Sequence, residues 1–379
     1  MIDGRNLTTM CESHNVNTTQ GIMCHAGPEY PDFPPPPPPQ GYEHFMAVNE
    51  FIKVAVPVIF ALGFPLNWVT FYIFSQSKLR DASSSRYIAA IAFVDNGVIL
   101  THLMHHLSGY YQIPVFALHG ACQMINYFNF MCTFLSIWYT TALVIDKFIG
   151  LYWPVQRSEY CTEFRAKCVA VSLAIFSVVF YHHLVWTMGP LKIFNGQIIC
   201  VPYQAPGLLD TWYTLNKVDY VIVAIIPYIT IVILLFLIVV RVCKYRTNER
   251  QLNGSIRGRP SNVSTQQEFK TMPLVIVVGT ATVTLGLLTN VCRIFEVVQH
   301  VVITVATFLS QVSFSCKFFL YVVTSEKFRD QLFGLCRQIV YKLLRVFHCN
   351  GRETERTFIS VNQQTDDIHE FECIVECAV

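Results

Sequence analysis

Two ionisable residues, Asp95 and Lys317, lie deep inside long apolar segments of the sequence. If such a segment crosses a membrane, an ionised side chain within it costs several kcal/mol unless it is paired, so both residues are candidates for a function. Several amides and hydroxyls share this apolar setting, among them Asn67, Asn126, Asn129 and Ser136. Hydrogen bonds between neighbouring helices explain these neutral groups adequately. Asp95 and Lys317 carry charges, so hydrogen bonds of this kind do not explain why they lie inside apolar segments.

The apolar segments that carry these residues have the length of membrane-spanning helices. Crossing a bilayer takes roughly 20 residues in a helix. Seven segments come close to this length, and they cover residues 51–75, 86–108, 121–150, 167–189, 218–243, 271–295 and 301–324. A composition of 53% hydrophobic and 14% charged residues also excludes an ordinary soluble domain of 379 residues. We therefore predict an all-α membrane protein, a bundle of seven transmembrane helices.

Basic residues lie mainly on one side of this bundle. Lys and Arg gather in the first, third and fifth connections and at the start of the carboxyl-terminal tail, whereas residues 109–120 and 296–300 contain neither. By the positive-inside rule, the amino terminus is extracellular and the carboxyl terminus cytosolic. We therefore expect glycosylation at the sequons of Asn6 and Asn17, in a Pro-rich extracellular tail of residues 1–48.

The same topology sorts the 14 cysteines. Those that face the oxidising side, where disulfides form, are Cys11, Cys24, Cys122 and Cys200, and four cysteines allow three pairings. Cys122 begins the third helix and Cys200 lies in the loop after the fourth. The simplest pairing joins these two, with Cys11–Cys24 as an optional second bridge.

Signs of an enzyme, a metal site or a transporter are weak. The sequence contains no nucleophile motif, Walker loop or H-E-x-x-H. His102 and His106 stand at helical spacing, but a structural zinc site needs four ligands and no cysteine or carboxylate pattern accompanies them. No internal repeat suggests the paired halves of many transporters. We expect no catalytic site, cofactor, bound metal or nucleic-acid partner.

An ordered set of landmarks over about residues 50–335 resembles the rhodopsin family of G-protein-coupled receptors. The landmarks are Asn67, Ile91-Ala92-Phe93-Val94-Asp95, Cys122, Asp146-Lys147-Phe148, Pro154, Cys200, Pro227 and Phe318-Phe319-Leu320-Tyr321. Within that family, three features resemble invertebrate FMRFamide-type and related neuropeptide receptors. They are Ser83-Ser84-Ser85-Arg86-Tyr87, the Cys161-Thr162 segment, and Phe318 where most members have Pro.

The resemblance implies a polar core in the middle of the bundle. Asp95 and Ser136 match a sodium site of related receptors, and Lys317 replaces an Asn that lies close to it. We therefore predict an Asp95–Lys317 ion pair, in a core that also contains Asn67 and Tyr321. In the alternative interpretation, Lys317 extends toward the cytosolic interface, as long basic side chains do near helix ends, and ignores Asp95.

The resemblance also implies where a G protein and a ligand bind. Asp146 and Lys147 match the Asp-Arg-Tyr triplet that couples to a G protein, with Lys147 in place of Arg. Amine receptors carry an Asp at the position of Asn129, and a small amine loses its main anchor without that anion. The long outer loop 190–217, with its aromatic residues, suits a peptide better. We place Asn126 and Asn129 in the ligand pocket.

Beyond the bundle of residues 49–325, the sequence has an amphipathic pattern. We predict a short eighth helix over residues 326–345 that lies on the inner membrane leaflet, and a cytosolic tail of residues 346–379. Cys336 and Cys349 are placed for palmitoylation.

Together these features predict a multi-pass plasma-membrane receptor that binds an extracellular peptide and signals to a heterotrimeric G protein. One alternative is a chemosensory receptor of the same fold for a small molecule. Another is a seven-helix transporter or channel, for which intramembrane charges are also expected.

Overall fold

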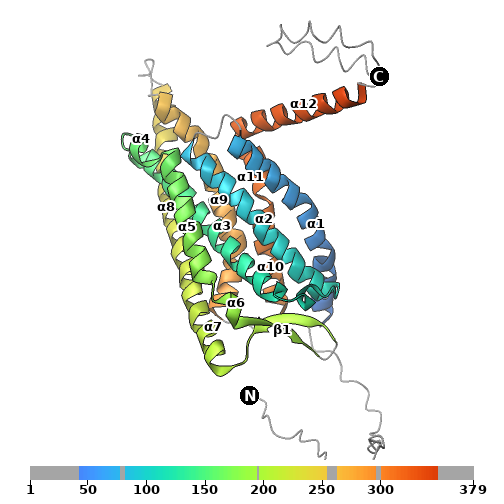
Figure 1. Ribbon diagram of the computed structural model, residues 1–379. Coiled ribbons are helices and arrows are strands. Elements are labelled where there is room, and N and C mark those ends of the chain that lie inside the picture. Colours follow the sequence, from blue (N-terminus) through green and yellow to red (C-terminus); the bar gives the residue numbers. More distant parts are fainter. Residues whose placement is uncertain (1–41, 77–81, 194–195, 254–262, 296–299, 349–379) are drawn as a thin grey trace, which may run out of the picture. The chain divides into compact units, whose positions relative to one another are not determined.

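The computed structural model describes residues 42–76, 82–193, 196–253, 263–295 and 300–348. Its main feature is a bundle of long helices that lie side by side (Figure 1). The two sequons at Asn6 and Asn17, the optional Cys11–Cys24 bridge and Cys349 lie outside the described residues.

Seven membrane spans account for this bundle. In the described part of the chain, six helical stretches are long and apolar enough to cross a membrane, namely Phe45–Gln76, Ser83–Tyr110, Ala121–Tyr152, Glu163–Thr187, Pro206–Asn248 and Thr271–Arg293. The seventh span is a bent pair of helices, Val301–Ser315 with Lys317–Thr324. The predicted seven-helix membrane fold is confirmed.

The helices that form the spans are as follows. The first three spans are α1 (Tyr42–Gln76), α2 (Ser83–Tyr110) and α3 (Ala121–Tyr152). The fourth consists of α5 (Glu163–Tyr181) and α6 (Leu184–Thr187), and the fifth of α7 (Pro206–Asp219), a π-helix (Tyr220–Ile225) and α8 (Ile226–Asn253). The last two are α9 (Val263–Ile294), then α10 (His300–Ser315) with α11 (Lys317–Thr324). The connections contain a 3-10 helix (Val115–Ala117) and α4 (Arg157–Tyr160).

The centre of the bundle lies at α2 and α3, which contain many of the buried residues. These helices approach closely at Gly97, where an added Cβ would come within 2.5 Å of the Cys132 sulfur. By contrast, α1 exposes large apolar side chains such as Val54 and Leu62. Lipid-facing positions of a membrane bundle carry such side chains, since the surrounding acyl chains are equally apolar.

The seventh span is bent by 46° at Cys316. Proline is the usual cause of a sharp kink, but this segment contains none. Instead, Ser315 Oγ donates to the Gln311 carbonyl at 3.2 Å and Cys316 Sγ donates to the Ser313 carbonyl at 3.7 Å. Side chains that bond back to the preceding turn compete with the helix ladder and favour bending. The bend makes Lys317 the first residue of a new helix.

The outer loop after the fourth span differs from the prediction. We expected a helix to residue 189, but α6 ends at Thr187 and Met188 begins strand β1 (Met188–Lys192). This strand pairs antiparallel with β2 (Ile198–Pro202), with Pro190 opposite Cys200. Pro190 has no backbone N–H and cannot continue a helix, which explains the early end.

The fifth span also begins earlier than expected. We predicted a start at residue 218, whereas α7 begins at Pro206. Proline suits the first helical turn, because its fixed backbone angle is helical and its missing N–H would have no partner there. The long loop is therefore a hairpin followed by about three additional turns of helix.

After the bundle, α12 (Glu326–His348) occupies the place of the predicted amphipathic helix. Phe328 on its inner face is buried against Phe74 and Tyr321, with ring centroids 5.5 and 5.9 Å away. Phe333 and Leu344 are exposed, as is Cys336. Contact of this helix with the inner leaflet, and palmitoylation, stay predictions.

Candidate functional site

The predicted polar core has a buried ion pair at its centre. Lys317 Nζ lies 2.8 Å from Asp95 Oδ2, and 3% and 0% of the two side chains are exposed. Ser136 Oγ donates to the other carboxylate oxygen at 2.5 Å, and Lys317 Nζ donates to Ser136 Oγ at 3.1 Å. The predicted pair is present, and the alternative in which Lys317 extends to the cytosolic interface is wrong.

This triad joins three spans. Asp95 belongs to α2, Ser136 to α3 and Lys317 to α11, directly after the bend. The Asp95 carboxylate accepts one hydrogen bond from Ser136 and one from the Lys317 ammonium. These bonds recover much of the free energy that burial of the charges costs, although a buried ion pair need not add net stability. The triad thus fixes how the inner half of the seventh span sits against the second and third.

The other two members of the predicted core lie nearby in different roles. Asn67 Nδ2 donates to the Phe314 carbonyl at 3.1 Å and links α1 to α10. Tyr321 is 1% exposed, and its ring contacts Phe74 at 5.8 Å. Its hydroxyl has no hydrogen-bond partner among the described residues, and the same holds for the side-chain amide of Asn96. Such groups are uncommon in native structures.

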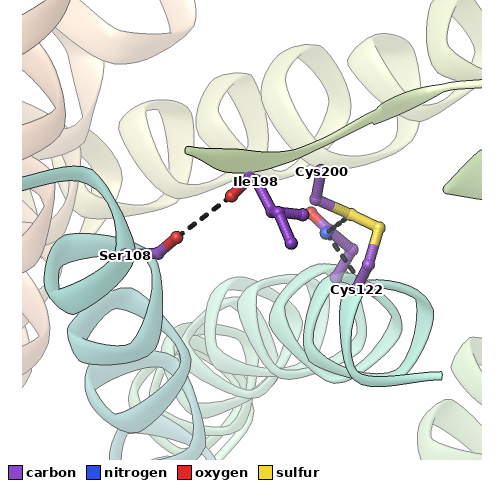
Figure 2. The surroundings of a disulfide bond; sticks show 5 residues. Ser108, Cys122, Ile198 and Cys200 are labelled. Carbon is purple, nitrogen blue, oxygen red and sulfur yellow. Dashed lines mark hydrogen bonds between the residues drawn. A yellow bond between two sulfur atoms is a disulfide. The ribbon is translucent and has the colours of Figure 1, made fainter. Parts of the chain in front are cut away.

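The outer face is organised by the Cys122–Cys200 disulfide, which confirms the predicted pairing. Figure 2 shows the bridge between α3 and the hairpin, with Ser108 of α2 close to Ile198. Ser108 Oγ donates to the Ile198 carbonyl at 3.3 Å. Gln197 Nε2 donates back to the Ser108 carbonyl at 2.8 Å. The hairpin is therefore tied to both central helices.

Both residues predicted for the ligand pocket have partners within the protein. Asn126 Nδ2 donates to the Cys122 carbonyl and to Cys200 Sγ, each at 2.9 Å, so it supports the disulfide. Asn129 Oδ1 accepts from Thr101 Oγ1 at 3.1 Å. Their contribution to ligand binding stays a prediction.

The histidines of α2 also have protein partners. His106 Nε2 lies 3.1 Å from the Lys53 carbonyl, and His102 Nδ1 lies 3.3 Å from Gln311 Nε2. These contacts connect α2 to the first and seventh spans, so packing between helices accounts for both rings.

A second charged cluster at the outer end of the bundle was missed in the sequence. Arg293 Nη2 donates to Asp219 Oδ2 at 2.9 Å, and Tyr181 donates its hydroxyl to Oδ1 of the same carboxylate. Both charged residues lie inside predicted spans, at 218–243 and 271–295. Asp219 is the second residue of its predicted span and Arg293 the third from the end of its own, so the rule that singled out the deeply placed Asp95 and Lys317 did not point to them.

At the end of the bundle that is predicted to face the cytosol, Asp146 and Lys147 lie in the penultimate turn of α3, and Lys147 is 7% exposed. The Asp146 carbonyl accepts a hydrogen bond from Cys161 Sγ at 3.4 Å. Burial, with the negative charge of Asp146 as a second cause, raises the pKa of the Cys161 thiol to about 12, so the thiol keeps the proton that it donates.

Ion pairs brace the same end of the bundle. Arg86 of α2 pairs with Glu163, the first residue of α5. Lys167 Nζ lies 2.7 Å from the same carboxylate. The Thr162 hydroxyl accepts from the Arg165 amide and caps α5. The second and fourth spans are thereby joined beside the predicted G-protein contact.

Comparison with known proteins agrees with this architecture. Residues 67–333 match the family described as 7 transmembrane receptor (rhodopsin family). The chain is 23% identical over 297 residues to the FMRFamide receptor of Drosophila melanogaster, covering 73% of this chain and 52% of that receptor. It therefore spans about half the length of this relative.

Two further relatives are covered more fully. The chain is 21% identical over 367 residues to the galanin-like G-protein coupled receptor npr-9 of Caenorhabditis elegans, which covers 86% of this chain and 83% of the relative. It is 22% identical over 305 residues to a purinoceptor of Mus musculus, which covers 76% and 79%. With most of the bundle matched and seven spans in place, the chain belongs to the rhodopsin family of seven-transmembrane receptors.

Proposed function

We propose that this protein is a plasma-membrane receptor that binds an extracellular peptide and activates a heterotrimeric G protein. Membership of a family of signalling receptors supports a receptor rather than an enzyme. Two of its relatives are named as an FMRFamide receptor and a galanin-like G-protein coupled receptor, which favours a peptide.

The main support for this proposal is the β1–β2 hairpin, which is fixed to the outer ends of α2 and α3. The disulfide joins β2 to α3, and Ser108 with Gln197 joins it to α2. A strand pair fixed at two places presents backbone and side-chain groups over an extended outer face. Such a face suits a ligand that contacts several spans at once, as a peptide does.

A small amine fits the site less well. The third-helix position at which amine receptors carry an Asp is Asn129, whose oxygen accepts from Thr101. A neutral amide oxygen attracts an ammonium far less than a carboxylate does. This removes the main reason to favour a biogenic amine.

Signalling requires that the ligand binds one conformation of the bundle more tightly than another. The buried triad ties the inner half of the seventh span to the second and third, and the third also contains Asp146 and Lys147 near its cytosolic end. A ligand that shifts the packing of the outer halves would change this arrangement, and we assign the cytosolic end to the G-protein contact.

A peptide-library screen tests the proposal. Cells that express the receptor together with a promiscuous G protein should give a calcium response to some peptides, and untransfected cells should give none. Surface expression is measured in parallel with an antibody to an amino-terminal tag. Silence of every peptide at normal surface expression, or substrate uptake or current without G protein, would contradict the proposal and favour the transporter alternative.

A further inference from the structure

The Asp219–Arg293 cluster contacts the outer half of α3, about two helical turns from the disulfide. Arg293 Cζ is 5.9 Å from the ring centre of Phe130, which follows Asn126 of α3 by four residues. It is 4.8 Å from the ring centre of Tyr220, the first residue of the π-helix. Short π-helical segments inside α-helices are frequent at functional sites. Arg293 is thus held at the junction of the third, fifth and sixth spans.

The two partners of this ion pair differ in accessibility. Only 3% of the Asp219 side chain is exposed, against 27% of the Arg293 side chain. Asp219 accepts from both Arg293 and Tyr181, one donor on each carboxylate oxygen. Both oxygens of the buried carboxylate are therefore occupied, whereas part of the Arg293 side chain is accessible.

An arginine in this position can bind a second acceptor. Its guanidinium offers five N–H donors in a rigid plane, and a carboxylate on one edge leaves the other edges for another oxyanion. The rings of Tyr220 and Phe130 contact the cation and hold it in place. Charge-assisted bonds of this kind are among the strongest in proteins, because the donor is already ionised.

A purely structural role explains the pair less well. Packing does not require an ion pair at this place, because apolar side chains of similar volume often replace a buried pair without loss of stability. Packing alone therefore gives no reason for a partly exposed cation in the outer half of the bundle.

We propose that Arg293 is a ligand-recognition residue that binds an oxyanion of the ligand, either a carboxylate or a phosphate. Asp219 and Tyr181 are positioning residues, because they touch the guanidinium or its carboxylate partner and fix the orientation of the edges that Asp219 does not contact. This inference rests on the proposed receptor function, and it adds the chemistry of one group that the ligand carries.

The test compares three pools of compounds on the same cells. The first pool contains peptides with a free carboxyl terminus. The second contains the same peptides as amides, with Asp and Glu replaced by Asn and Gln. The third contains nucleoside triphosphates. Each pool is applied to wild type, Arg293→Gln, Arg293→Lys and Asp219→Asn, with Lys53→Gln as the control for loss of one positive charge in the outer half of α1.

We expect the active acidic peptides to be at least roughly tenfold more potent than their neutral counterparts on wild type, as charge-assisted bonds predict. Arg293→Gln should abolish this preference, and Lys53→Gln should keep it. Arg293→Lys keeps the charge but loses the planar fork, so the preference should fall; this variant decides the matter if Arg293→Gln does not reach the surface. Asp219→Asn should also weaken the preference, a change that lower surface expression alone would not produce.

The possible results separate the two proposals. Equal potency of acidic and neutral peptides, or a preference that survives in the Arg293 variants, overturns the oxyanion site and leaves the peptide receptor standing. A response to nucleoside triphosphates alone, lost in Arg293→Gln, supports the oxyanion site and overturns the peptide ligand. Silence of all pools on wild type overturns both.

Discussion

The Lys317 ammonium and the Asp95 carboxylate face each other across the bundle at 2.8 Å, and Ser136 bonds to both. Lys317 reaches this place from the first turn of α11, directly after the bend at Cys316. The packing of the inner half of the seventh span therefore depends on the carboxylate of Asp95 in the second span.

Replacement of one member of this pair should destabilise the receptor more than replacement of both. Asp95→Asn strands a buried ammonium, and loss of one partner of a buried pair costs about 3–5 kcal/mol. Asp95→Asn with Lys317→Asn removes both charges and should recover much of the loss. Thermal unfolding of the purified variants measures this. A double variant no more stable than the worse single variant would show that the two charges are not coupled.

Sodium should not stabilise the wild-type protein specifically, because the Lys317 ammonium already lies beside the carboxylate that would bind the ion. Lys317→Asn leaves Asp95 without its cation, so sodium should raise the melting temperature of this variant. The measurement compares sodium with N-methylglucamine chloride at equal ionic strength. A clear sodium effect on wild type would argue against the pair in solution.

The sequence predicted those features that depend on local composition. Apolar length located the spans, and topology reduced the 14 cysteines to four, among them the bridged Cys122 and Cys200. The Asp95–Lys317 pair followed from a family resemblance rather than from spacing, because the two residues are far apart in the chain. The spans could be predicted because the bilayer interior offers backbone polar groups no partner outside a helix or a closed barrel.

Other features depend on contacts that the sequence does not display. The β1–β2 hairpin consists of two short strands in a loop, and its register depends on the disulfide and on bonds to Ser108. The partners of Asn126 could not be predicted from the sequence. One is the Cys122 carbonyl in the preceding helical turn, and the other is Cys200 Sγ on the hairpin, 74 residues away in the chain. Arg293 was overlooked because it stands at the end of a span, where a charge is easily assigned to the interface.

The Cys122–Cys200 bridge should be needed for a functional outer face. It joins residues separated by 78 positions. Chain-entropy estimates for such a loop give about 4 kcal/mol. Cys200→Ala should sharply reduce surface expression and peptide response, whereas the exposed free cysteine variant Cys168→Ala should resemble wild type. Normal behaviour of Cys200→Ala, or free thiols at both positions by non-reducing mass spectrometry, would contradict this role.

Lys147 should couple to the G protein more weakly than an arginine would. Arginine offers a planar fork for two hydrogen bonds, whereas lysine offers a compact and strongly hydrated ammonium. Lys147→Arg should therefore raise agonist-stimulated nucleotide exchange several-fold at equal surface expression, and Lys147→Gln should lower it. An unchanged or weaker response of Lys147→Arg would indicate that the lysine is adapted to its own partner.

Membrane orientation can be tested through the sequons. If the amino terminus is extracellular, glycosidase treatment should lower the apparent mass of the protein, and Asn6→Gln with Asn17→Gln should abolish this shift. The sequons at Asn253 and Asn262 should stay unmodified. A shift that disappears only in Asn253→Gln would reverse the topology.

Nucleotide exchange by the purified receptor shows whether a bound peptide activates a G protein. The full-length protein is placed in lipid nanodiscs with a heterotrimeric G protein, and the release of GDP is followed with and without an active peptide from the library screen. We predict faster release with the peptide for wild type and a much smaller effect for Cys200→Ala. A peptide that binds wild type tightly but leaves the rate of GDP release unchanged across the G-protein subtypes would contradict the proposed signalling function.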